Sequence, residues 1–304
     1  MLIYLNDYYM QVKKAVIIAA GFGTRFLPAT KAQPKELMPI VDKPVLEFIV
    51  EEMIDSGIKE IIFVVNKNKI AIENHFDRLF ELEYTLEKSN KMHLLEKIKA
   101  IHDKIKIAYV RQWAPLGTAH ALLSAKEFIG DEPFAFSDAD SVIDAKVPVT
   151  KQLIDIFKET GKPIVGVKQA EGEERKFLSR YGNIYGKEIK DNLYKIEDSV
   201  EKPDPDKGEQ ASPDGLYIAG MRNILTPDIF PFLEKLKPSK GGEYYVNEGI
   251  KEYIKNEEMH ALVYEGKYYD TGDKLGYLKA NVEFALKHKE VGDSFKDYLH
   301  DLKL

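Results

Sequence analysis

Glycines and cations are crowded into one short segment near the start of the chain. Gly21 and Gly23 follow an apolar run, and Arg25 comes shortly after them. Glycine lets a backbone approach a phosphate closely, and successive free N–H groups form a concavity that binds anions. The segment therefore predicts a polyphosphate site at the carboxyl end of a sheet strand. Three more cations follow, between prolines that we expect to hold the chain extended, namely Lys31, Lys35 and Lys43.

Neither of the two common phosphate-binding motifs accounts for this segment. A Walker loop requires Gly-Lys-Ser or Gly-Lys-Thr at the start of a helix, and no such triplet stands at the required distance. The dinucleotide fingerprint would place its third glycine at Phe26, and the chain then runs into prolines instead of a helix. The failure of the dinucleotide fingerprint argues against an NAD-dependent enzyme. The combination of Arg25 with Lys35 has a spacing that neither motif explains.

Three loops with residues that could do chemistry each leave the carboxyl end of a predicted strand. In an open α/β sheet this is the edge at which ligands bind. We therefore expect the three loops to meet at one site. The strands and the loops that follow them are 15–20 with 21–25, 105–110 with 112–120, and 134–136 with 137–141.

The rest of the chain alternates helices and strands. Apolar spacing after Pro44 predicts a helix that ends near Gly57, and 60–65 is a β-branched run typical of a buried strand. With the first strand they form a βαβ unit whose crossover is right-handed. We expect two helices within 68–102, and loops around a hairpin at 181–186 and 200–215. Further helices are predicted to end near 128 and to lie over 149–159, 226–236, 241–254 and 274–290, and further strands over 163–167, 216–219, 261–264 and 268–269.

Composition limits the class of protein and its compartment. The 304 residues allow one large α/β domain or two small ones. The absence of cysteine excludes disulfides and thiolate metal sites, and the net charge of −6 provides no basic footprint for nucleic acid. The first residues lack the basic start of a signal peptide, and no apolar run approaches the ~20 residues of a membrane span. We therefore expect a soluble, cytoplasmic protein that binds neither nucleic acid nor membrane.

Several stretches together resemble the sugar-1-phosphate nucleotidylyltransferases, and most of all the bacterial-type UTP–glucose-1-phosphate uridylyltransferases (UDP-glucose pyrophosphorylases). The likeness covers nearly the whole chain from Lys13. It implies a three-layer, Rossmann-like α/β fold with a mostly parallel, mixed central sheet and a small sugar-binding lobe. The stretches that carry it are AAGFGTRFLPATKAQPKELMPIVDKP, RQWAPLGTAHA, DEPFAF, VEKP, LTPDIFPFLEKLKP and YYDTGDKLGYLKANVEFALKHKE.

The resemblance also implies how the chain is divided. A nucleotidyltransferase domain is expected over 13–290, with the sugar-binding lobe at about 170–270. Residues 1–12 form an N-terminal extension, and 291–304 form a C-terminal helix that could contact another subunit. The family's habit of assembly implies a homodimer or homotetramer.

The reaction implied by the resemblance joins UTP and α-D-glucose 1-phosphate to give UDP-glucose and pyrophosphate, with Mg²⁺. A phosphate oxygen of the sugar phosphate must attack the α-phosphorus of the nucleotide. Both partners are anions, so the protein needs cations, a metal and in-line positioning rather than a general base. The resemblance assigns Arg25, Lys35, Lys202 and Asp140 to catalysis. The nucleotide would lie against Ala20, Gly21 and Gly23, and the fork of the Arg25 guanidinium suits two phosphate oxygens at once.

Asp140 matches the metal-binding aspartate of the family. The family commonly has Gly-Asp here, whereas this chain has Ala139-Asp140 preceded by Asp138. Strand alternation puts Asp138 and Asp140 on the same face, where Asp138 either assists at the metal or caps the turn. Asp270 resembles a second metal carboxylate, and the alternative is that it only shapes a glycine turn.

The remaining assignments concern the base and the sugar. The amide of Gln112 suits the imide edge of uracil or of thymine alike. In the sugar half, Glu201 would accept sugar hydroxyls, and Lys202 would neutralise the attacking phosphate. His120 is expected to pack or cap, and Trp113 to lie in the core or at the rim. The glycines implied in binding are Gly117 at the base and Gly182 and Gly220 at the sugar.

Three departures from the family pattern lie in the sugar half of the site. They are Asn183 at a usually hydrophobic position, Gly220-Met221-Arg222 in place of Gly-Arg-Tyr, and Glu243-Tyr244-Tyr245-Val246-Asn247-Glu248 in place of Glu-Ile-Gln-Leu-Thr-Asp. They leave open another sugar 1-phosphate, such as that of galactose or an N-acetylhexosamine, and dTTP stays open as the nucleotide. A hypothesis from another class is a catalytically inactive regulatory subunit that binds nucleotide sugars, and the retained Asp140 argues against it.

Overall fold

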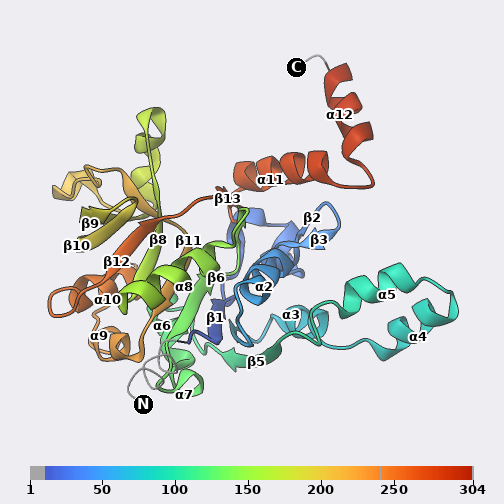
Figure 1. Ribbon diagram of the computed structural model, residues 1–304, viewed down its shortest axis with the longest axis horizontal. Coiled ribbons are helices and arrows are strands. Elements are labelled where there is room, and N and C mark those ends of the chain that lie inside the picture. Colours follow the sequence, from blue (N-terminus) through green and yellow to red (C-terminus); the bar gives the residue numbers. More distant parts are fainter. Residues whose placement is uncertain (1–10, 240, 303–304) are drawn as a thin grey trace.

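A nine-stranded sheet forms the centre of the protein, in a computed structural model that describes residues 11–239 and 241–302 (Figure 1). Helices cover both faces of this sheet. Its strands lie side by side in the order β5 (Lys106–Arg111), β4 (Glu60–Val65), β1 (Lys14–Ile18), β6 (Phe134–Asp138), β11 (Leu216–Leu225), β8 (Ile164–Gln169), β12 (His260–Val263), β10 (Leu193–Glu201) and β9 (Gly182–Lys190).

The sheet is mixed, but most of its strands point the same way. β1 pairs in parallel with β4 and β6. β5 pairs in parallel with β4, and β12 pairs in parallel with β8. β11 runs antiparallel to β6 and β8, and β10 runs antiparallel to β12 and β9. Among the described strands of this sheet, only β10 and β11 are therefore reversed. The predicted mostly parallel, mixed sheet is confirmed.

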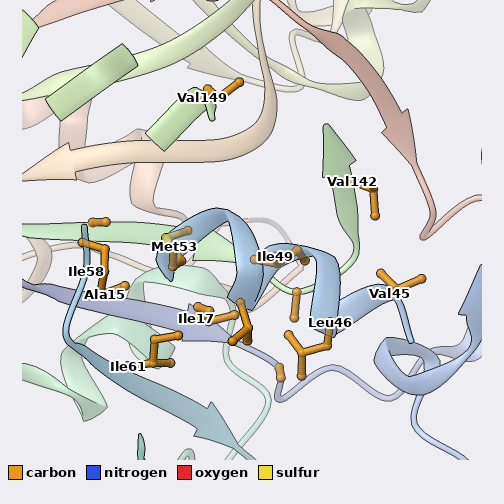
Figure 2. Packing of buried hydrophobic residues seen from close by; sticks show 14 of the residues in the cluster. Ala15, Ile17, Val45, Leu46, Ile49, Met53, Ile58, Ile61, Val142 and Val149 are labelled. Atoms are coloured by element: carbon orange, nitrogen blue, oxygen red, sulfur yellow. The ribbon is translucent and has the colours of Figure 1, made fainter. Parts of the chain in front are cut away.

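Successive residues of β1 point to opposite faces of the sheet, and each face has its own apolar cluster. Ala15 and Ile17 enter one cluster, and Val16 enters the other. Figure 2 shows helix α2 (Val45–Asp55) with Ile49 and Met53 directed at the first face. These clusters make the fold three-layered. The helices of the first layer include α2 and α8 (Val149–Thr160), and those of the other include α6 (Thr118–Ser124), α9 (Phe230–Leu233) and α10 (Val246–Tyr253).

Short pairings outside the main sheet position the loops around its edge. β7 (Ser141–Asp144) pairs with β13 (Lys267–Asp270), so that Asp270 lies opposite Ser141. β2 (Pro39–Ile40) pairs with β3 (Lys43–Pro44). The remaining helices are α3 (Ile70–His75), α4 (Phe80–Lys88), α5 (Met92–Lys99), α7 (Lys126–Ile129), α11 (Lys274–Lys287) and α12 (Gly292–Asp301), with 3₁₀ turns at Thr24–Phe26, Ala29–Lys31, Lys35–Leu37, Gly172–Arg180, Pro205–Lys207 and Pro227–Ile229.

The prediction that the opening segment is extended between its prolines is wrong. The segment is coiled into three 3₁₀ turns. The carbonyls of Pro28 and Pro34 each accept a hydrogen bond from the residue three positions on, at 3.0 Å. Proline's fixed φ suits the start of such a turn as well as an extended chain. This coiling determines which cations of the segment point to the same side of it.

Two other predicted elements are wrong. The region 68–102 holds three short helices instead of two, because the buried Phe76 takes the chain into the core between α3 and α4. The region 181–186 is not a loop, since Gly182 begins strand β9. A Cβ on Gly186 would lie 2.5 Å from the carbonyl oxygen of Lys195, so this glycine permits a close approach of β9 to β10.

The two ends of the chain are described only in part. Residues 1–10 of the predicted N-terminal extension and 303–304 of the C-terminal segment lie outside the described residues. α11 and α12 project away from the sheet in Figure 1. No helix among the described residues combines the length and apolar character that crossing a bilayer requires. β9 to β12 continue the same sheet as β1, and the boundaries of the sugar-binding lobe stay a prediction.

Candidate active site

The three loops predicted to meet at one edge of the sheet line a single pocket of about 380 Å³. They leave the carboxyl ends of β1, β5 and β6. Residues of β9, β10 and β11 line the same pocket. Of the residues predicted for the site, those that line the pocket are Ala20, Gly21, Arg25, Lys35, Gln112, Gly117, Asp140, Gly182, Glu201, Lys202, Gly220 and Asp270.

Three residues of the opening segment lie elsewhere. Lys31 is exposed, and Lys43 forms an ion pair with Glu51 at 2.6 Å. The interpretation of all four cations as one anion-binding ladder is therefore corrected to Arg25 and Lys35. Gly23 is also absent from the pocket lining. Its φ is 66°, and a Cβ added to it would lie 3.2 Å from the Cβ of Lys35. A side chain there would crowd Lys35, so Gly23 lets that lysine reach the pocket.

Lys35 and Asp140 form an ion pair at the floor of the pocket. Burial alone would lower the pKa of the Lys35 ammonium, but Asp140 and Glu36 raise it above its ordinary value. Burial would likewise raise the pKa of Asp140, and Lys35 with Arg25 lowers it below its ordinary value. Both groups are therefore charged at neutral pH.

Asp138 stands beside this pair but is held differently. Its Oδ2 accepts a hydrogen bond from the Ser141 hydroxyl at 2.6 Å, and its Oδ1 lies 3.4 Å from the Arg222 guanidinium. Burial and the neighbouring Asp140 raise the pKa of Asp138 to about 7, against the opposing effect of Arg222. Both of its oxygens thus face groups of the protein, which fits a brace of the turn better than a ligand of a metal.

Asp140 and Asp270 converge on Gly272. A Cβ built there would collide with Asp140 Oδ2 and lie 3.1 Å from Asp270 Oδ1, and Arg25 donates to the Gly272 carbonyl at 3.4 Å. Burial and Asp140 raise the pKa of Asp270 against the opposing effect of Arg25, as expected for two carboxylates close together. The described residues contain no cluster of three or more acidic, histidine or cysteine ligands. Mg²⁺ is usually held by one or two carboxylates with substrate phosphates and water, so this pair fits such an ion.

Gln112 also lines the pocket and is anchored within its own loop. Its Nε2 donates to the Gly117 carbonyl at 3.1 Å and lies 3.1 Å from Nδ1 of His120. The packing or capping role of His120 stays a prediction. The Gln112 Oε1 has no hydrogen-bond partner among the described residues. Gly117 has a φ of 93°, and a Cβ there would lie 2.5 Å from the Tyr244 carbonyl oxygen. Trp113 is 95% exposed at the rim of this loop.

Glu201 and Lys202 lie at the end of β10, where other elements hold them in place. Asn247 donates to Glu201 Oε2 at 2.5 Å, and Lys202 Nζ lies 3.3 Å from Glu201 Oε1. The ammonium of Lys202 also stands 4.8 Å from the ring centroid of Tyr245, whose hydroxyl donates to Glu243 at 2.5 Å. Lys202 has a φ of 47°, a backbone conformation that needs such support.

Of the three departures from the family pattern, two contribute residues to the pocket lining and one does not. Asn183 does not line the pocket but is fully buried, donating to the Leu178 carbonyl at 2.8 Å and accepting from the Ser212 N–H at 3.0 Å. It therefore braces loops behind the site. Met221 and Glu243 do line the pocket.

Three residues at the site had no role predicted for them, although Asn247 and Arg222 stand among the departures from the family pattern. Asn247 orients Glu201, and the guanidinium of Arg222 bonds to groups directly behind the pocket. Glu36 lines the pocket and pairs at 2.6 Å with the buried Lys69. The signal that was available is a charged residue inside an otherwise apolar run, which must find a partner when it is buried.

Known proteins are similar to this chain over almost its full length. Residues 14–286 match the model of a family described as nucleotidyl transferase. UTP–glucose-1-phosphate uridylyltransferase 2 of Staphylococcus saprophyticus subsp. saprophyticus is 42% identical over 294 residues, which is 97% of this chain and 99% of the relative. The UTP–glucose-1-phosphate uridylyltransferase of Bacillus subtilis (strain 168) is 43% identical over 292 residues, which is 96% of this chain and 97% of the relative.

Solved structures of similar proteins superpose on the same fold. A UTP-bound UGPase from Acinetobacter baumannii gives a TM-score of 0.86 at 33% identity and covers 96% of this chain and 100% of its own. A UDP-glucose pyrophosphorylase complexed with UDP-glucose gives a TM-score of 0.82 at 35% identity, with coverage of 91% and 100%. The structures of these two proteins thus contain UTP and UDP-glucose, respectively.

Proposed function

The chain belongs to the nucleotidyl transferase family, and from this membership we propose that it is a UTP–glucose-1-phosphate uridylyltransferase. It converts UTP and α-D-glucose 1-phosphate into UDP-glucose and pyrophosphate. The observation that carries the proposal is that cations from two separate parts of the chain, Arg25 with Lys35 and Lys202, line one pocket. A reaction between two phosphates needs two such groups facing each other.

The nucleotide half of the pocket is proposed to bind the triphosphate of UTP. Arg25 would hold phosphate oxygens with its fork, and Lys35 would add a point charge next to them. The backbone at Ala20 and Gly21 would approach the nucleotide closely. The free Oε1 of Gln112 would accept the hydrogen bond of the N3–H of uracil, since its Nε2 is already committed to Gly117. Thymine has the same N3–H, so this contact alone does not reject dTTP.

The sugar half is proposed to present the attacking group. Lys202 would neutralise the phosphate of glucose 1-phosphate, and Glu201 would accept hydrogen bonds from hydroxyls of the sugar. A nonbridging oxygen of this phosphate then forms a bond to the α-phosphorus, while the bond from that phosphorus to the β-phosphate oxygen breaks. Pyrophosphate leaves with the electron pair, and no proton has to move. The chain's contribution is to align the two anions and to screen their repulsion.

Asp140 and Asp270 are the residues proposed to hold Mg²⁺. When bound, the ion supplies positive charge to the triphosphate and to the departing pyrophosphate. The pairing of Asp140 with Lys35 keeps this carboxylate ionised, which is the form that a hard cation requires.

We also propose that the chain is cytoplasmic and assembles as a homodimer or homotetramer. α11 and α12 project from the body and leave large apolar side chains exposed, including Leu275 and Leu278 at 60% and Tyr298 at 58%. Such a face favours contact with a second copy. Light scattering of the purified protein would test the assembly, and the mass of a single chain would contradict it.

Substitution of Gly182 by alanine tests the sugar half. A Cβ on Gly182 would collide with Asn247 Nδ2 and lie 3.1 Å from Glu201 Oε2, so it must displace the pair that orients the sugar. Overpacking of this kind typically costs 1–3 kcal/mol. We expect the KM for glucose 1-phosphate to rise about tenfold in Gly182→Ala, with the KM for UTP changed less than about twofold. Steady-state rates with each substrate varied in turn would measure both constants.

The matched control is Gly241→Ala, because nothing lies within 4 Å of a Cβ at that glycine. Both constants should stay at their original values in this variant. Equal changes of the two KM values in Gly182→Ala would show that the Gly182 region does not belong to the sugar half alone.

A crossed substrate assay tests the proposed function itself. UTP, dTTP and the other nucleoside triphosphates would each be paired with glucose, galactose and N-acetylhexosamine 1-phosphates, and pyrophosphate release would be followed with a coupled enzyme. We expect the highest kcat/KM for UTP with glucose 1-phosphate. A clearly faster reaction with another pair would contradict the proposed substrates while leaving the type of reaction intact.

A further inference from the structure

The buried guanidinium of Arg222 is surrounded by acceptors, and several of these belong to the wall of the pocket. The side chain is 1% exposed. Its Nη1 donates to the Ser137 hydroxyl at 2.8 Å and to the Gly220 carbonyl at 2.6 Å, and its Nη2 donates to the Ser141 carbonyl at 2.9 Å. Asp138 Oδ1 lies 3.4 Å from Nη1. Asp138, Ser141 and Gly220 all line the pocket from which Arg222 itself is withdrawn.

The opposite side of the guanidinium is held by a carboxylate from another layer of the fold. Glu52 on α2 accepts from Nε and Nη2 of Arg222 at 2.8–3.1 Å. Glu52 in turn accepts from the N–H and the hydroxyl of Thr150 at the start of α8, at 3.0 and 2.7 Å. The five N–H groups of Arg222 thus tie the helix layer to the end of β6, the start of β7 and the middle of β11.

The backbone of β11 is distorted where it delivers this side chain. Gly220 and Met221 have φ values of 73° and 44°, and the pairing of β11 with β8 is interrupted between Ile218 and Asn223. A non-glycine residue with positive φ is costly and persists where surrounding contacts hold it. A bulge of this kind re-aims a side chain next to a functional site.

We propose that Arg222 is a positioning residue for the transfer reaction, which fixes the turn 138–141 between β6 and β7 against Gly220 and Glu52. That turn carries Asp140, which forms an ion pair with Lys35 of the nucleotide half. A shift of the turn would misalign the two phosphates without removing any group that touches them. The inference rests on the proposed function, because its effect is measured on that reaction.

A role in packing alone would not require this arrangement. Apolar side chains of similar volume often replace a buried ion pair with no loss of stability, because desolvation of the two charges offsets their attraction. An apolar residue could not, however, hold the carbonyls of Gly220 and Ser141 and the hydroxyl of Ser137 at fixed positions. Stability and positioning can therefore be separated by substitution.

The test compares Arg222→Met and Arg222→Lys with the double variant Glu52→Gln/Arg222→Met. The single Met variant leaves Glu52 buried without its cation, so its melting temperature should fall. The double variant removes both charges, and its melting temperature should recover much of that loss. We expect kcat at saturating UTP and glucose 1-phosphate to be about 10- to 100-fold lower in Arg222→Met and in the double variant alike, and several-fold lower in Arg222→Lys.

A second readout separates positioning from loss of the nucleotide site. Isothermal titration calorimetry with UTP alone measures UTP affinity without any turnover. The affinity should change less than about threefold in all three variants, since the side-chain contacts of Arg222 include no residue of the loops 21–25 and 112–120. The control Phe157→Leu, a core residue of α8 outside the pocket, should lower the melting temperature and leave kcat unchanged.

Recovery of kcat together with the melting temperature in the double variant, to within about twofold of the unmodified protein, would overturn the inference. A kcat in Arg222→Lys equal to that of the unmodified protein would overturn it as well. Absence of turnover in the unmodified protein would instead overturn the proposed function, and the inference with it.

Discussion

Replacing Asp140 by asparagine should lower kcat by about a thousandfold or more, which corresponds to about 4 kcal/mol of transition-state stabilisation. Asp140 is the one carboxylate that both pairs with Lys35 and converges with Asp270 on Gly272. An amide of the same shape keeps the packing but loses the charge that a metal needs. UTP binding should be retained, because removing a negative charge from the pocket does not oppose the binding of a triphosphate.

The measurement combines kcat from pyrophosphate release with UTP affinity from isothermal titration calorimetry. The matched control is Asp155→Asn on α8, where the aspartate forms an exposed pair with Lys151 far from the pocket lining. This control should keep its full rate. A rate in Asp140→Asn within about tenfold of the unmodified protein would show that Asp140 is not essential to the reaction. Undetectable turnover in both the variant and the unmodified protein would favour the catalytically inactive binding subunit.

The second large effect is expected for Lys35→Met. The ammonium of Lys35 is the cation that faces Asp140, and its loss leaves the carboxylates of the pocket floor without their main counter-charge. They would then repel the incoming triphosphate. We expect kcat/KM for UTP to fall about 100- to 1000-fold, as is typical when one donor to a developing oxyanion is removed.

Lys31→Met is the matched control, because it removes a lysine of the same segment that is exposed and does not line the pocket. We expect its kcat/KM for UTP to stay within about twofold of the original value. If both variants lost activity equally, the general charge of the segment would matter and the specific position of Lys35 would not.

The sequence predicted the parts of the site that depend on local order along the chain. A strand, a glycine loop and an arginine follow one another within 13 residues of Lys13, and the carboxyl ends of parallel strands must meet at one edge. The resemblance then added Glu201, Lys202 and Asp270, which lie on distant segments. All three line the pocket.

The rest depended on geometry that spacing along the chain does not encode. Lys31, Lys35 and Lys43 look equivalent in sequence, and only the coiling of the segment into 3₁₀ turns separates Lys35 from the other two. Arg222 pairs with Glu52, 170 positions earlier, and a strand distortion decides which way its side chain points. The start of β9, at 181–186, resembles a loop in sequence because of its glycines, but Gly186 serves a close approach of strands rather than a turn.

The central claim is that one pocket joins two phosphates, and ³¹P NMR of the reaction mixture tests it most directly. UTP, glucose 1-phosphate and Mg²⁺ would be incubated with the protein, and the signals of substrates and products followed together. We predict that UTP and glucose 1-phosphate disappear at equal rates while UDP-glucose and pyrophosphate appear in equal amounts. Formation of UMP and pyrophosphate with glucose 1-phosphate unchanged, or no change in any signal, would contradict the account.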